Sequence, residues 1–473
     1  MFAKAQRVHF IGIGGIGMSG IAEILLSLGY PVSGSDLKRS PITERLAGLG
    51  ATIFEGHAAA NVLGAAVVVV SSAVNDLNPE VVEARASNVT VIQRAEMLAE
   101  LMRLKYGIAV AGMHGKTTTT SMIAAILAGG GLDPTIVVGG RIDAMGSNAR
   151  HGKSQYLVAE ADESDRSFLK LSPILGVVTN LDREHMDCYR DMADVEAAFV
   201  SFMDRVPFYG AVTACLDDPL LAAILLRVRR RVYTYGFTPG ADFVCRLLPA
   251  GEGARSRFEV VAAGHVLGAF ALHVPGRHNV LNATAAIAIG TQLEIAPQKM
   301  ATALAEFRGV DRRFQLKGMA RGVTVVDDYG HHPTEIRATL AAARDCGYRH
   351  IHVIFQPHRY TRTRDLMDEF ATAFNEADSV ELLDIYAASE EPIPGIDAEA
   401  LTARIHASKS NGTHVHHSGN ASDAIAAIAS RAQDGDLIMT LGAGSVSQLG
   451  PQILEALGKE TIAGRNPSTS NRS

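Results

Sequence analysis

The sequence predicts an α/β protein of three domains built largely on parallel sheets. Its 473 residues are enough for about three domains of ordinary size. Short apolar runs without polar alternation, such as Val67–Ser71, recur between helical stretches. Runs of this kind are typical of strands covered on both faces, as in parallel sheets. Glycine-rich loops directly follow two of the runs, at Gly12 and Gly112, as they do in nucleotide-binding strand–loop–helix units.

The first expected domain spans residues 1–104. Strands and helices alternate along it, and Gly29 and Gly50 mark the ends of its two helices. Its expected strands are Val8–Ile13, Val32–Asp36 and Val67–Ser71, and its expected helices are Ser19–Leu28 and Ile42–Leu49.

The second and third expected domains span residues 105–312 and 313–473, and both continue the alternation. The second has expected strands at Ile108–Ala111, Tyr156–Glu160 and Ile174–Thr179, helices at Thr118–Leu127 and Asn279–Leu293, and a β-rich stretch at Phe243–Val274. The third has expected strands at Thr324–Val326, Ile351–Phe355 and Leu437–Leu441, and helices at Glu335–Asp345, Leu366–Asn375 and Asp423–Gln433. The polar end, Asn466–Ser473, is expected to be a disordered tail.

Composition excludes several classes of protein. The 44 Lys and Arg against 50 Asp and Glu give a net charge of −6, which argues against a general nucleic-acid binder. The four cysteines are scattered, which excludes a disulfide framework and fits a reducing cytosol. No apolar stretch approaches the roughly 20 residues of a membrane span, and Glu23 interrupts the N-terminal run. We therefore expect a cytoplasmic protein that does not enter a membrane.

The first motif is a Gly-x-Gly-x-x-Gly loop between an expected strand and helix, with Asp36 ending the next strand. Glycines such as Gly14 and Gly15 let the backbone approach a diphosphate, and the acid reaches a hydroxyl group. A diphosphate occurs in both NAD and UDP-sugars, so this motif leaves the nucleotide open.

The second motif, at residues 112–118, reads Gly-Met-His-Gly-Lys-Thr-Thr and also lies between a strand and a helix. In such a loop the backbone cradles phosphates, Lys116 reaches the terminal ones, and the Thr117 hydroxyl can hold Mg²⁺. The loop departs from the standard P-loop, because Val110 stands five residues before Gly115 where a glycine is usual. The context still favours phosphoryl transfer or hydrolysis.

Acids and a histidine follow the next two expected strands. Among the acids at 160–165, Glu160 is the best metal-ligand candidate because it directly ends its strand. His185 follows the strand at 174–179 and is a candidate for a second metal. Asn279 and Asn282 share one face of a helix start, where they could read an adenine edge or simply cap the helix.

The third domain carries two further clusters after strands, at residues 327–333 and 357–364. Both are expected outside the carboxyl ends of parallel strands, where α/β proteins bind ligands. Arg359 and Arg362 could clamp a carboxylate or a phosphate. Their place at a helix start opposes the helix dipole, which favours a bound anion over a bare surface.

Taken together, these motifs resemble the Mur ligase family. The resemblance covers nearly the whole chain in order and spacing, and it is carried by HFIGIGGIGMSGIAE, SGSD, GMHGKTTTT, EADESD, DREHMD, PGRHNVLNA, DRRFQ, VDDYGHHPTEI and FQPHRYTRTRDL. It implies a Rossmann-like first domain, a central P-loop-type ATPase domain and a Rossmann-like C-terminal domain. One departure is Met113, which stands where a small hydroxyl residue is common.

Within the family, the closest resemblance is to members that join L-alanine to UDP-N-acetylmuramate in peptidoglycan synthesis, with consequences for cell shape and division. It implies ATP and Mg²⁺ as cofactors and an acyl-phosphate intermediate. It also implies two small-molecule substrates, no nucleic-acid or membrane partner, and a monomer or weak homodimer.

The resemblance assigns roles residue by residue. ATP is bound by Gly112, Met113, His114, Gly115, Lys116, Thr117, Thr118, Asn279, Asn282, Arg313 and Asp328. Lys116, Glu160 and His185 are catalytic, and the metal ligands are Thr117, Glu160 and His185. The UDP-sugar is bound by Gly14, Gly15, Asp36, Ser71 and Ser72, and the alanine side is formed by His331, Arg359, Tyr360 and Arg362.

Three alternatives stay open at this point. A recycling ligase that attaches a whole tripeptide to the same sugar nucleotide shares the ATP site. An NAD-dependent oxidoreductase explains the first glycine loop but leaves Lys116 and its acids without a role. A nucleotide-gated binding protein explains both loops but not the metal acids.

Overall fold

The computed structural model describes residues 6–71, 73–142, 147–249, 255–408 and 414–463. The chain forms two compact units. The N-terminal unit comprises Met1–Leu272 and Asn279–Val310, and the C-terminal unit comprises His273–His278 and Asp311–Ser473. Each unit is described below by itself.

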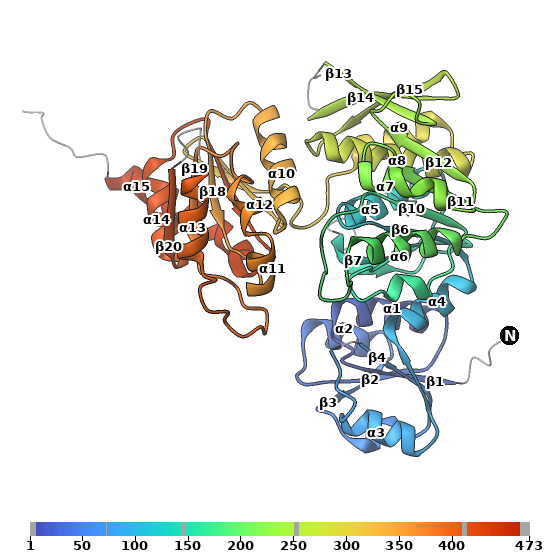
Figure 1. Cartoon of the computed structure of the whole chain (residues 1–473). Helices are drawn as coiled ribbons and strands as arrows, with labels where there is room; N and C mark the ends of the chain where they lie inside the picture. Colours follow the sequence, from blue (N-terminus) through green and yellow to red (C-terminus); the bar gives the residue numbers. More distant parts are fainter. Residues whose placement is uncertain (1–5, 72, 143–146, 250–254, 409–413, 464–473) are drawn as a thin grey trace, which may run out of the picture. The chain divides into compact units, whose positions relative to one another are not determined.

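The N-terminal unit begins with a five-stranded sheet in the order β3-β2-β1-β4-β5, in which every pairing is parallel (Figure 1). Its strands are β1 (Arg7–Ile11), β2 (Val32–Asp36), β3 (Thr52–Glu55), β4 (Ala65–Val70) and β5 (Thr90–Gln93). Its helices are α1 (Ile16–Ser27), α2 (Pro41–Gly48), α3 (Pro79–Ala86) and α4 (Arg94–Arg103). Most residues of β1, β2 and β4 are buried, including the polar His9, Ser33 and Ser35, so the helices cover the sheet on both sides.

A second sheet of ten strands follows, in the order β15-β14-β13-β12-β11-β10-β6-β9-β7-β8. Its strands are β6 (Tyr106–Ala111), β7 (Thr135–Ile142), β8 (Ser147–Arg150), β9 (Tyr156–Glu160), β10 (Leu175–Val178), β11 (Ala211–Cys215), β12 (Val232–Gly236), β13 (Phe243–Leu248), β14 (Ser256–Ala262) and β15 (His265–Leu272). In the order of the sheet, the seven strands from β13 across to β7 all run parallel to one another. The sheet is extended by antiparallel pairings at both ends, with β14 and β15 beyond β13 and β8 beyond β7.

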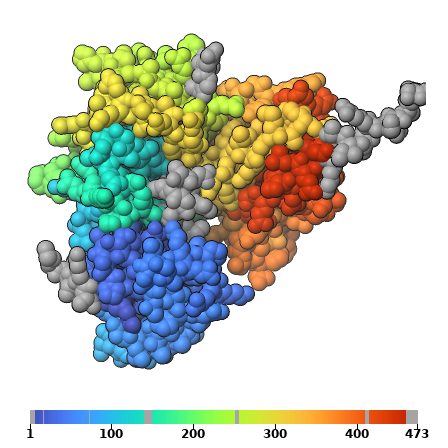
Figure 2. All heavy atoms as spheres, turned by 180° about the vertical axis from the view of Figure 1, so that it is seen from behind, coloured from blue at the N-terminus to red at the C-terminus, as the bar shows by residue number. Residues whose placement is uncertain are grey.

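Helices and short 3₁₀ turns accompany this second sheet. They are α5 (Lys116–Gly129), η3 (Ser167–Lys170), α6 (Met192–Asp204), α7 (Pro219–Ile224), α8 (Arg277–Gln292) and α9 (Pro297–Glu306). The two sheets of the N-terminal unit lie against each other, because α1 contacts β7 and β8 while α4 contacts β6 and η3 (Figure 2, blue against cyan).

The C-terminal unit has a six-stranded sheet in the order β16-β17-β21-β18-β19-β20. Its strands are β16 (Gln315–Ala320), β17 (Val323–Asp328), β18 (Ile351–Phe355), β19 (Ser379–Leu383), β20 (His414–Gly419) and β21 (Leu437–Leu441). Only β16 is antiparallel to its neighbour. Its helices are α10 (Pro333–Asp345), α11 (Tyr360–Asp365), α12 (Met367–Ala371), α13 (Ala398–Ala407), α14 (Ala421–Arg431) and α15 (Gly450–Ala463). Two apolar core clusters cover the two faces of this sheet.

The expected three-part α/β fold with mostly parallel sheets is confirmed. One expectation is wrong: within the expected helix Leu366–Asn375 only α12, Met367–Ala371, is α-helical. The preceding α11 is a separate short helix, because Leu366 between them leaves the helical region at φ −119° and ψ 22°. The polar tail, Asn466–Ser473, lies outside the described residues, and the boundaries near 104 and 312 stay predictions. Among the described helices, not one has the length and apolar character needed to cross a membrane.

Candidate active site

The second glycine loop connects β6 to α5, at the carboxyl edge of the ten-stranded sheet. Two of its glycines are required by close approach as well as by backbone conformation. Gly112 has φ +130°, and a Cβ atom there would lie 2.0 Å from Thr179 Oγ1. Gly115, the N-cap of α5, has φ +82°, and a Cβ atom would lie 2.7 Å from Asn282 Oδ1. The loop therefore leaves its backbone uncovered by side chains at these two glycines, directly before a helix N-terminus, which suits phosphate oxygens.

Lys116 is folded over the mouth of this loop. Its Nζ donates to the carbonyl oxygens of Gly112, at 2.7 Å, and Met113, at 3.1 Å. The same Nζ lies 2.7 Å from Oε1 of Glu163, whose side chain is only 1% exposed. Burial lowers the pKa of Lys116, but the negative charges of Glu163, Glu184 and Asp162 outweigh burial and raise it. Lys116 is therefore a fixed positive charge beside the loop.

Glu163 is the acid that pairs with Lys116. The sequence argument singled out Glu160 as a metal ligand, and Glu160 ends β9 beside Val110 of β6. Glu163 lies in the loop that follows, where Tyr189 donates from its hydroxyl to the Glu163 carbonyl at 2.7 Å. His185, in the left-handed region at φ 56°, places Nε2 3.5 Å from Glu163 Oε1. The structure therefore brings Lys116 and His185 to one carboxylate that the sequence pattern did not distinguish from its neighbours.

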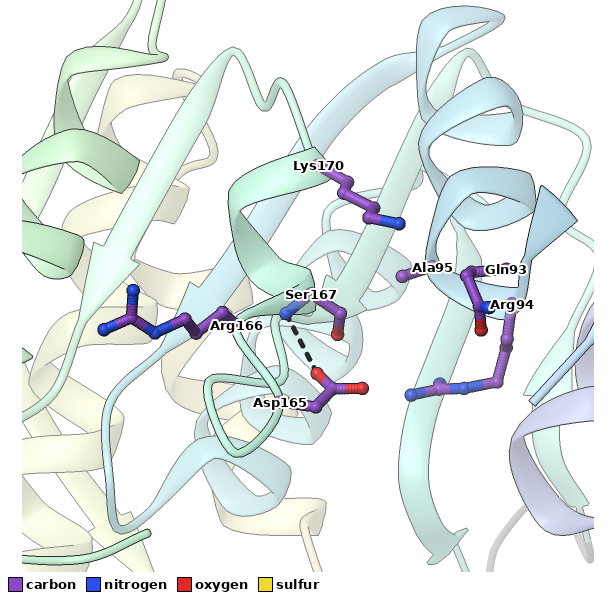
Figure 3. Close-up of a pocket in the computed structure, with 7 residues that line it drawn as sticks. All are labelled: Gln93, Arg94, Ala95, Asp165, Arg166, Ser167 and Lys170. Atoms are coloured by element: carbon purple, nitrogen blue, oxygen red, sulfur yellow. Dashed lines mark hydrogen bonds between the residues drawn. The ribbon is translucent and has the colours of Figure 1, made fainter. Parts of the chain in front are cut away.

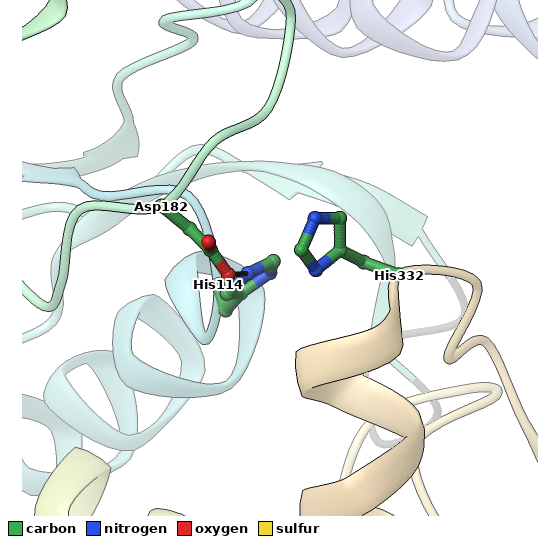
Figure 4. Close-up of side chains that lie close together, drawn as sticks. All are labelled: His114, Asp182 and His332. Atoms are coloured by element: carbon green, nitrogen blue, oxygen red, sulfur yellow. Dashed lines mark hydrogen bonds and ion pairs between the residues drawn. The ribbon is translucent and has the colours of Figure 1, made fainter. Parts of the chain in front are cut away.

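The loop is braced from the next strand by Asn180 and Asp182. The N–H of His114 donates to Asn180 Oδ1 at 2.8 Å, and Asn180 Nδ2 donates back to the His114 carbonyl at 3.0 Å. His114 Nε2 lies 2.8 Å from Asp182 Oδ2 (Figure 4). The side chain of Met113 is buried. Both the side chain and the backbone of His114 therefore hold the shape of the loop.

Asn279 and Asn282 lie in the first turns of α8 and are both buried. Asn282 Oδ1 accepts a hydrogen bond from the Thr119 hydroxyl at 3.1 Å, and its Nδ2 donates to Asn279 Oδ1 at 3.3 Å. The bond from Thr119 ties α8 to α5 directly behind Gly115. The bond from Asn282 to Asn279 stays within α8, and the choice between adenine contact and helix capping stays a prediction.

The first glycine loop, between β1 and α1, is closed by Asp36. Asp36 Oδ2 accepts from the Gly14 N–H at 2.8 Å, and Oδ1 accepts from the Leu37 N–H at 2.8 Å. Gly15 is exposed at the N-cap of α1. Ser71 follows β4 at the same carboxyl edge of the sheet, and Ser72 lies outside the described residues. The loop is thus shaped by Asp36 before any ligand arrives.

In the C-terminal unit, Asp328 ends β17 and is committed to local structure. Its carboxylate accepts from the N–H groups of Phe314, at 2.7 Å, and Gly330, at 2.8 Å. Burial raises the pKa of Asp328 against the opposing charge of Arg313. Arg313 donates to Glu335 at 3.3 Å and lies over the Tyr329 ring, 5.1 Å from its centroid. Asp328 therefore shapes the turn next to Arg313.

The residues expected to bind the L-alanine substrate lie around His358, a residue that the sequence argument did not single out. The His331 and His358 rings lie 6.0 Å apart, and Arg362 Nη1 donates to the His358 carbonyl at 3.1 Å. Arg359 is the N-cap of α11 and has φ 71°, and Tyr360 begins the helix. Burial and the charge of Arg362 lower the pKa of His358 to about 4, so it is neutral at pH 7. The cluster carries a net positive charge suited to a carboxylate.

Comparison with known families gives three consecutive matches. A model described as the Mur ligase family catalytic domain matches residues 7–106, and a Mur ligase middle domain matches residues 110–290. A model described as the Mur ligase glutamate ligase domain matches residues 312–444.

Individual relatives match along almost the entire chain. The UDP-N-acetylmuramate–L-alanine ligase of Acidobacterium capsulatum is 70% identical over 457 residues, which are 97% of this chain and 99% of the relative. The enzyme of the same name from Koribacter versatilis is 68% identical, over 98% of this chain and 100% of its own length. Among solved structures, a UDP-N-acetylmuramate-alanine ligase from Thermotoga maritima aligns with a TM-score of 0.76 at 29% identity, over 96% of this chain and 99% of that one. With two glycine loops and a buried Lys116–Glu163 pair at the edges of its sheets, the chain belongs to the Mur ligase family.

Proposed function

We infer that this chain is an ATP-dependent ligase that joins the carboxylate of UDP-N-acetylmuramate to L-alanine, a step of peptidoglycan precursor synthesis. The observation that carries this inference is the phosphate loop with its buried Lys116–Glu163 pair, in a chain 70% identical over nearly its full length to a ligase of that name. An NAD-dependent oxidoreductase has no use for such a pair. A tripeptide-adding ligase is disfavoured by the names of the relatives at 70% and 68% identity.

The chemistry of the reaction explains why the site needs a positive charge near the phosphates. A carboxylate is a poor acyl donor, so it first attacks the γ-phosphate of ATP, and ADP leaves. The acyl phosphate then carries a good leaving group, and the alanine amine displaces phosphate through a tetrahedral intermediate. Two anions must meet in the first step, so the site has to supply positive charge. Lys116 is that charge in the N-terminal unit, since its pKa is raised and its position is fixed.

The residues around the phosphate loop fit a magnesium ion. Oε2 of Glu163 is buried and accepts no hydrogen bond within the described part of the chain, as expected of an oxygen awaiting a cation or its water. The Thr117 hydroxyl and the Glu160 carboxylate are oxygen donors of the type that Mg²⁺ prefers. We propose Thr117, Glu160 and His185 as its holders, where the ion would neutralise charge on the transferring phosphoryl group.

The remaining roles follow the two units. In the N-terminal unit, Gly14, Gly15, Asp36 and Ser71 serve the UDP-sugar, while Asn279 and Asn282 serve the adenine nucleotide. In the C-terminal unit, Arg313 and Asp328 bind ATP, and L-alanine is bound by His331, Arg359, Tyr360 and Arg362. We propose that the enzyme works in the cytoplasm as a monomer or weak homodimer.

The test is phosphate release from ATP by the purified full-length chain with UDP-N-acetylmuramate, each amino acid or the tripeptide being added in turn. Release that requires both the sugar nucleotide and L-alanine, and that stops with a chelator and resumes with Mg²⁺, is expected. Release at the same rate without either substrate, or a preference for the tripeptide, would contradict the proposal.

A further inference from the structure

Three neighbouring strands of the C-terminal sheet, β21, β18 and β19, run parallel and end beside one another. Gly444, His358 and Tyr386 each lie three residues beyond the end of their strand, in the loop that follows it. The loop after β18 also carries the two arginines proposed for the carboxylate of the amino acid. The loop after β19, residues 384–390, belongs to no motif that the sequence argument used.

The loop after β19 is bonded at two points to the loop that carries the arginines. The Tyr386 N–H donates to the Pro357 carbonyl at 2.8 Å, and the Tyr386 carbonyl accepts from the Arg359 N–H at 2.9 Å. Farther along, the carboxylate of Glu390 accepts from the Thr361 N–H at 3.0 Å and from the Thr361 hydroxyl at 2.6 Å. The backbone of Tyr386 is therefore fixed relative to the arginines.

The ring of Tyr386 is stacked on the ring of His358. The two ring planes differ by 12° and the centroids are 5.5 Å apart, an offset arrangement that aromatic rings prefer. Nδ1 of His358 lies 3.2 Å from Nη1 of Arg362. His358 is neutral at pH 7, because burial and the nearby cations lower its pKa to about 4. The stacked pair is therefore an uncharged surface directly beside Arg362.

The absence of a side chain at Gly444 leaves room for the Tyr386 ring. A Cβ atom on Gly444 would lie 3.0 Å from Tyr386 Cγ. The backbone of Gly444 does not require glycine, since its φ is −90°, so the close approach of the ring is what excludes a side chain. The loop around Gly444 is held by Gln356, whose Oε1 accepts from the Val446 N–H at 3.2 Å. The ring is therefore packed from the side of β21 and has no space into which to retreat.

The conformation of these loops is specified by the fold. Three of their residues other than glycine have positive φ, namely Arg359 at 71°, Ala388 at 49° and Ser389 at 71°. Such backbone persists only where the surrounding structure determines it, as in ligand clamps. Tyr386 is nonetheless 43% exposed, so a ligand can reach the ring.

We propose that Tyr386 determines which amino acid is accepted, by forming a rigid wall that limits the side chain of the substrate to a methyl group. This inference rests on the proposed function. The carboxylate of an amino acid is drawn to Arg359 and Arg362, and its amine has to face the acyl phosphate. The side chain is the remaining substituent and needs an uncharged surface, which the stacked rings of Tyr386 and His358 supply. Because the Tyr386 ring cannot retreat, a longer side chain collides with it.

The decisive measurement is the kcat/KM of the full-length protein for glycine, L-alanine and L-2-aminobutyrate, whose side chains grow by one carbon at each step. Phosphate release from ATP is followed with UDP-N-acetylmuramate present. In the unaltered protein, L-alanine should exceed L-2-aminobutyrate by about tenfold to two-hundredfold. In Tyr386→Ala this ratio should fall at least about tenfold, because the vacated space accepts the longer side chain. Tyr386→Phe keeps the ring, so it should keep the ratio within about twofold.

Gly444→Ala should act in the opposite direction. The added methyl group pushes the Tyr386 ring toward the ligand, which narrows the pocket. The ratio of kcat/KM for L-alanine to that for glycine should therefore fall about tenfold.

Two variants in the N-terminal unit are controls. Tyr209→Ala removes an aromatic ring that is 65% exposed. Lys170→Ala changes a side chain that lines a cavity of about 390 Å³ (Figure 3) and is paired with Glu96. Both should leave the ratios among the three amines unchanged. In Tyr386→Ala the KM values for ATP and UDP-N-acetylmuramate should stay within about twofold of those of the unaltered protein.

The outcomes separate the possible explanations. Equal losses for L-alanine and L-2-aminobutyrate in Tyr386→Ala would show a merely structural residue and overturn the proposal, and an unchanged ratio would overturn it as well. If Tyr386→Ala does not fold, Gly444→Ala decides, and an unchanged ratio of L-alanine to glycine there overturns the proposal. If the unaltered protein releases no phosphate with any of the three amines, the proposed function itself fails, and the role of Tyr386 with it.

Discussion

Lys116 Nζ and Glu163 Oε1 lie 2.7 Å apart, with the carboxylate buried in the N-terminal unit. Burying a charge is costly unless it is paired, and here each member compensates the other. On the proposed function, phosphates bound in the loop would compete with Glu163 for the same ammonium group. The ion pair therefore holds the Lys116 side chain in place before ATP binds. Replacing Lys116 and replacing Glu163 should have different effects, and each is tested separately.

Replacing Lys116 by alanine should abolish ligation while sparing the sugar nucleotide. The positive charge that meets the transferring phosphoryl group is lost, so the rate of phosphate release should fall at least about a hundredfold. We propose that UDP-N-acetylmuramate binds at the other glycine loop, so its calorimetric affinity should change little. Loss of both together would mean that the two loops do not serve separate ligands.

Glu163→Gln should lower kcat more than it changes the KM for ATP. The amide keeps the volume but removes the charge that orients Lys116 and lies 3.5 Å from His185, so we expect kcat to fall roughly tenfold to a hundredfold. The control is Glu196→Gln, which should retain full activity. Glu196 lies on α6 and forms an ion pair with Arg227. A kcat that matches the unaltered enzyme would count against a role for Glu163.

Gly115→Ala should lose ATP binding through a collision with Asn282. An added Cβ would lie 2.7 Å from Asn282 Oδ1, and φ +82° strains any L-residue by about 1 kcal/mol or more. Gly131→Ala is the matched control, since Gly131 has φ +91° but open space around it. Both variants should lower the melting temperature, but only Gly115→Ala should weaken ATP more than about tenfold in a titration. Equal ATP affinities in the two variants would exclude the collision.

Because of Glu80, the stability of the first sheet should depend on pH in the acidic range. Burial raises its pKa, but contacts from His9, Ser35 and Asn61 outweigh burial and lower it from 4.5 to about 2. The Ser35 hydroxyl donates to it at 2.6 Å and Asn61 Nδ2 at 2.5 Å. A depressed carboxyl pKa contributes stability that is complete above pH 4.5 and is lost as the pH falls toward 2. At pH 7 this amounts to roughly 3 kcal/mol.

Glu80→Gln should therefore melt below the unaltered protein at pH 7, and the difference should shrink markedly at pH 3. Calorimetric melting at the two pH values measures both effects. Glu83→Gln, on the same helix, controls for the loss of one charge. A gap between Glu80→Gln and the unaltered protein that is as large at pH 3 as at pH 7 would argue against this linkage.

Local patterns in the sequence were enough to predict the strands that carry the site. Val32–Asp36, Tyr156–Glu160, Ile351–Phe355 and Leu437–Leu441 are strands with the expected bounds. A short buried run flanked by turn residues is a local signal, and it held even where polar residues such as Ser33, His352 and Thr440 lie within the strand. The glycine loops were predictable for the same reason, since their chemistry needs neighbouring residues of fixed type.

The sequence by itself determined the fold class, the two nucleotide loops and Lys116. The tertiary structure decided which partners these residues meet: Glu163 for Lys116, and Asn282 behind Gly115. These partners are far apart in sequence, and the hydrogen bond from Thr119 to Asn282 joins residues 163 positions apart. Such pairs depend on how helices and strands pack, and packing is set by the summed contacts of the whole core, which no local pattern records.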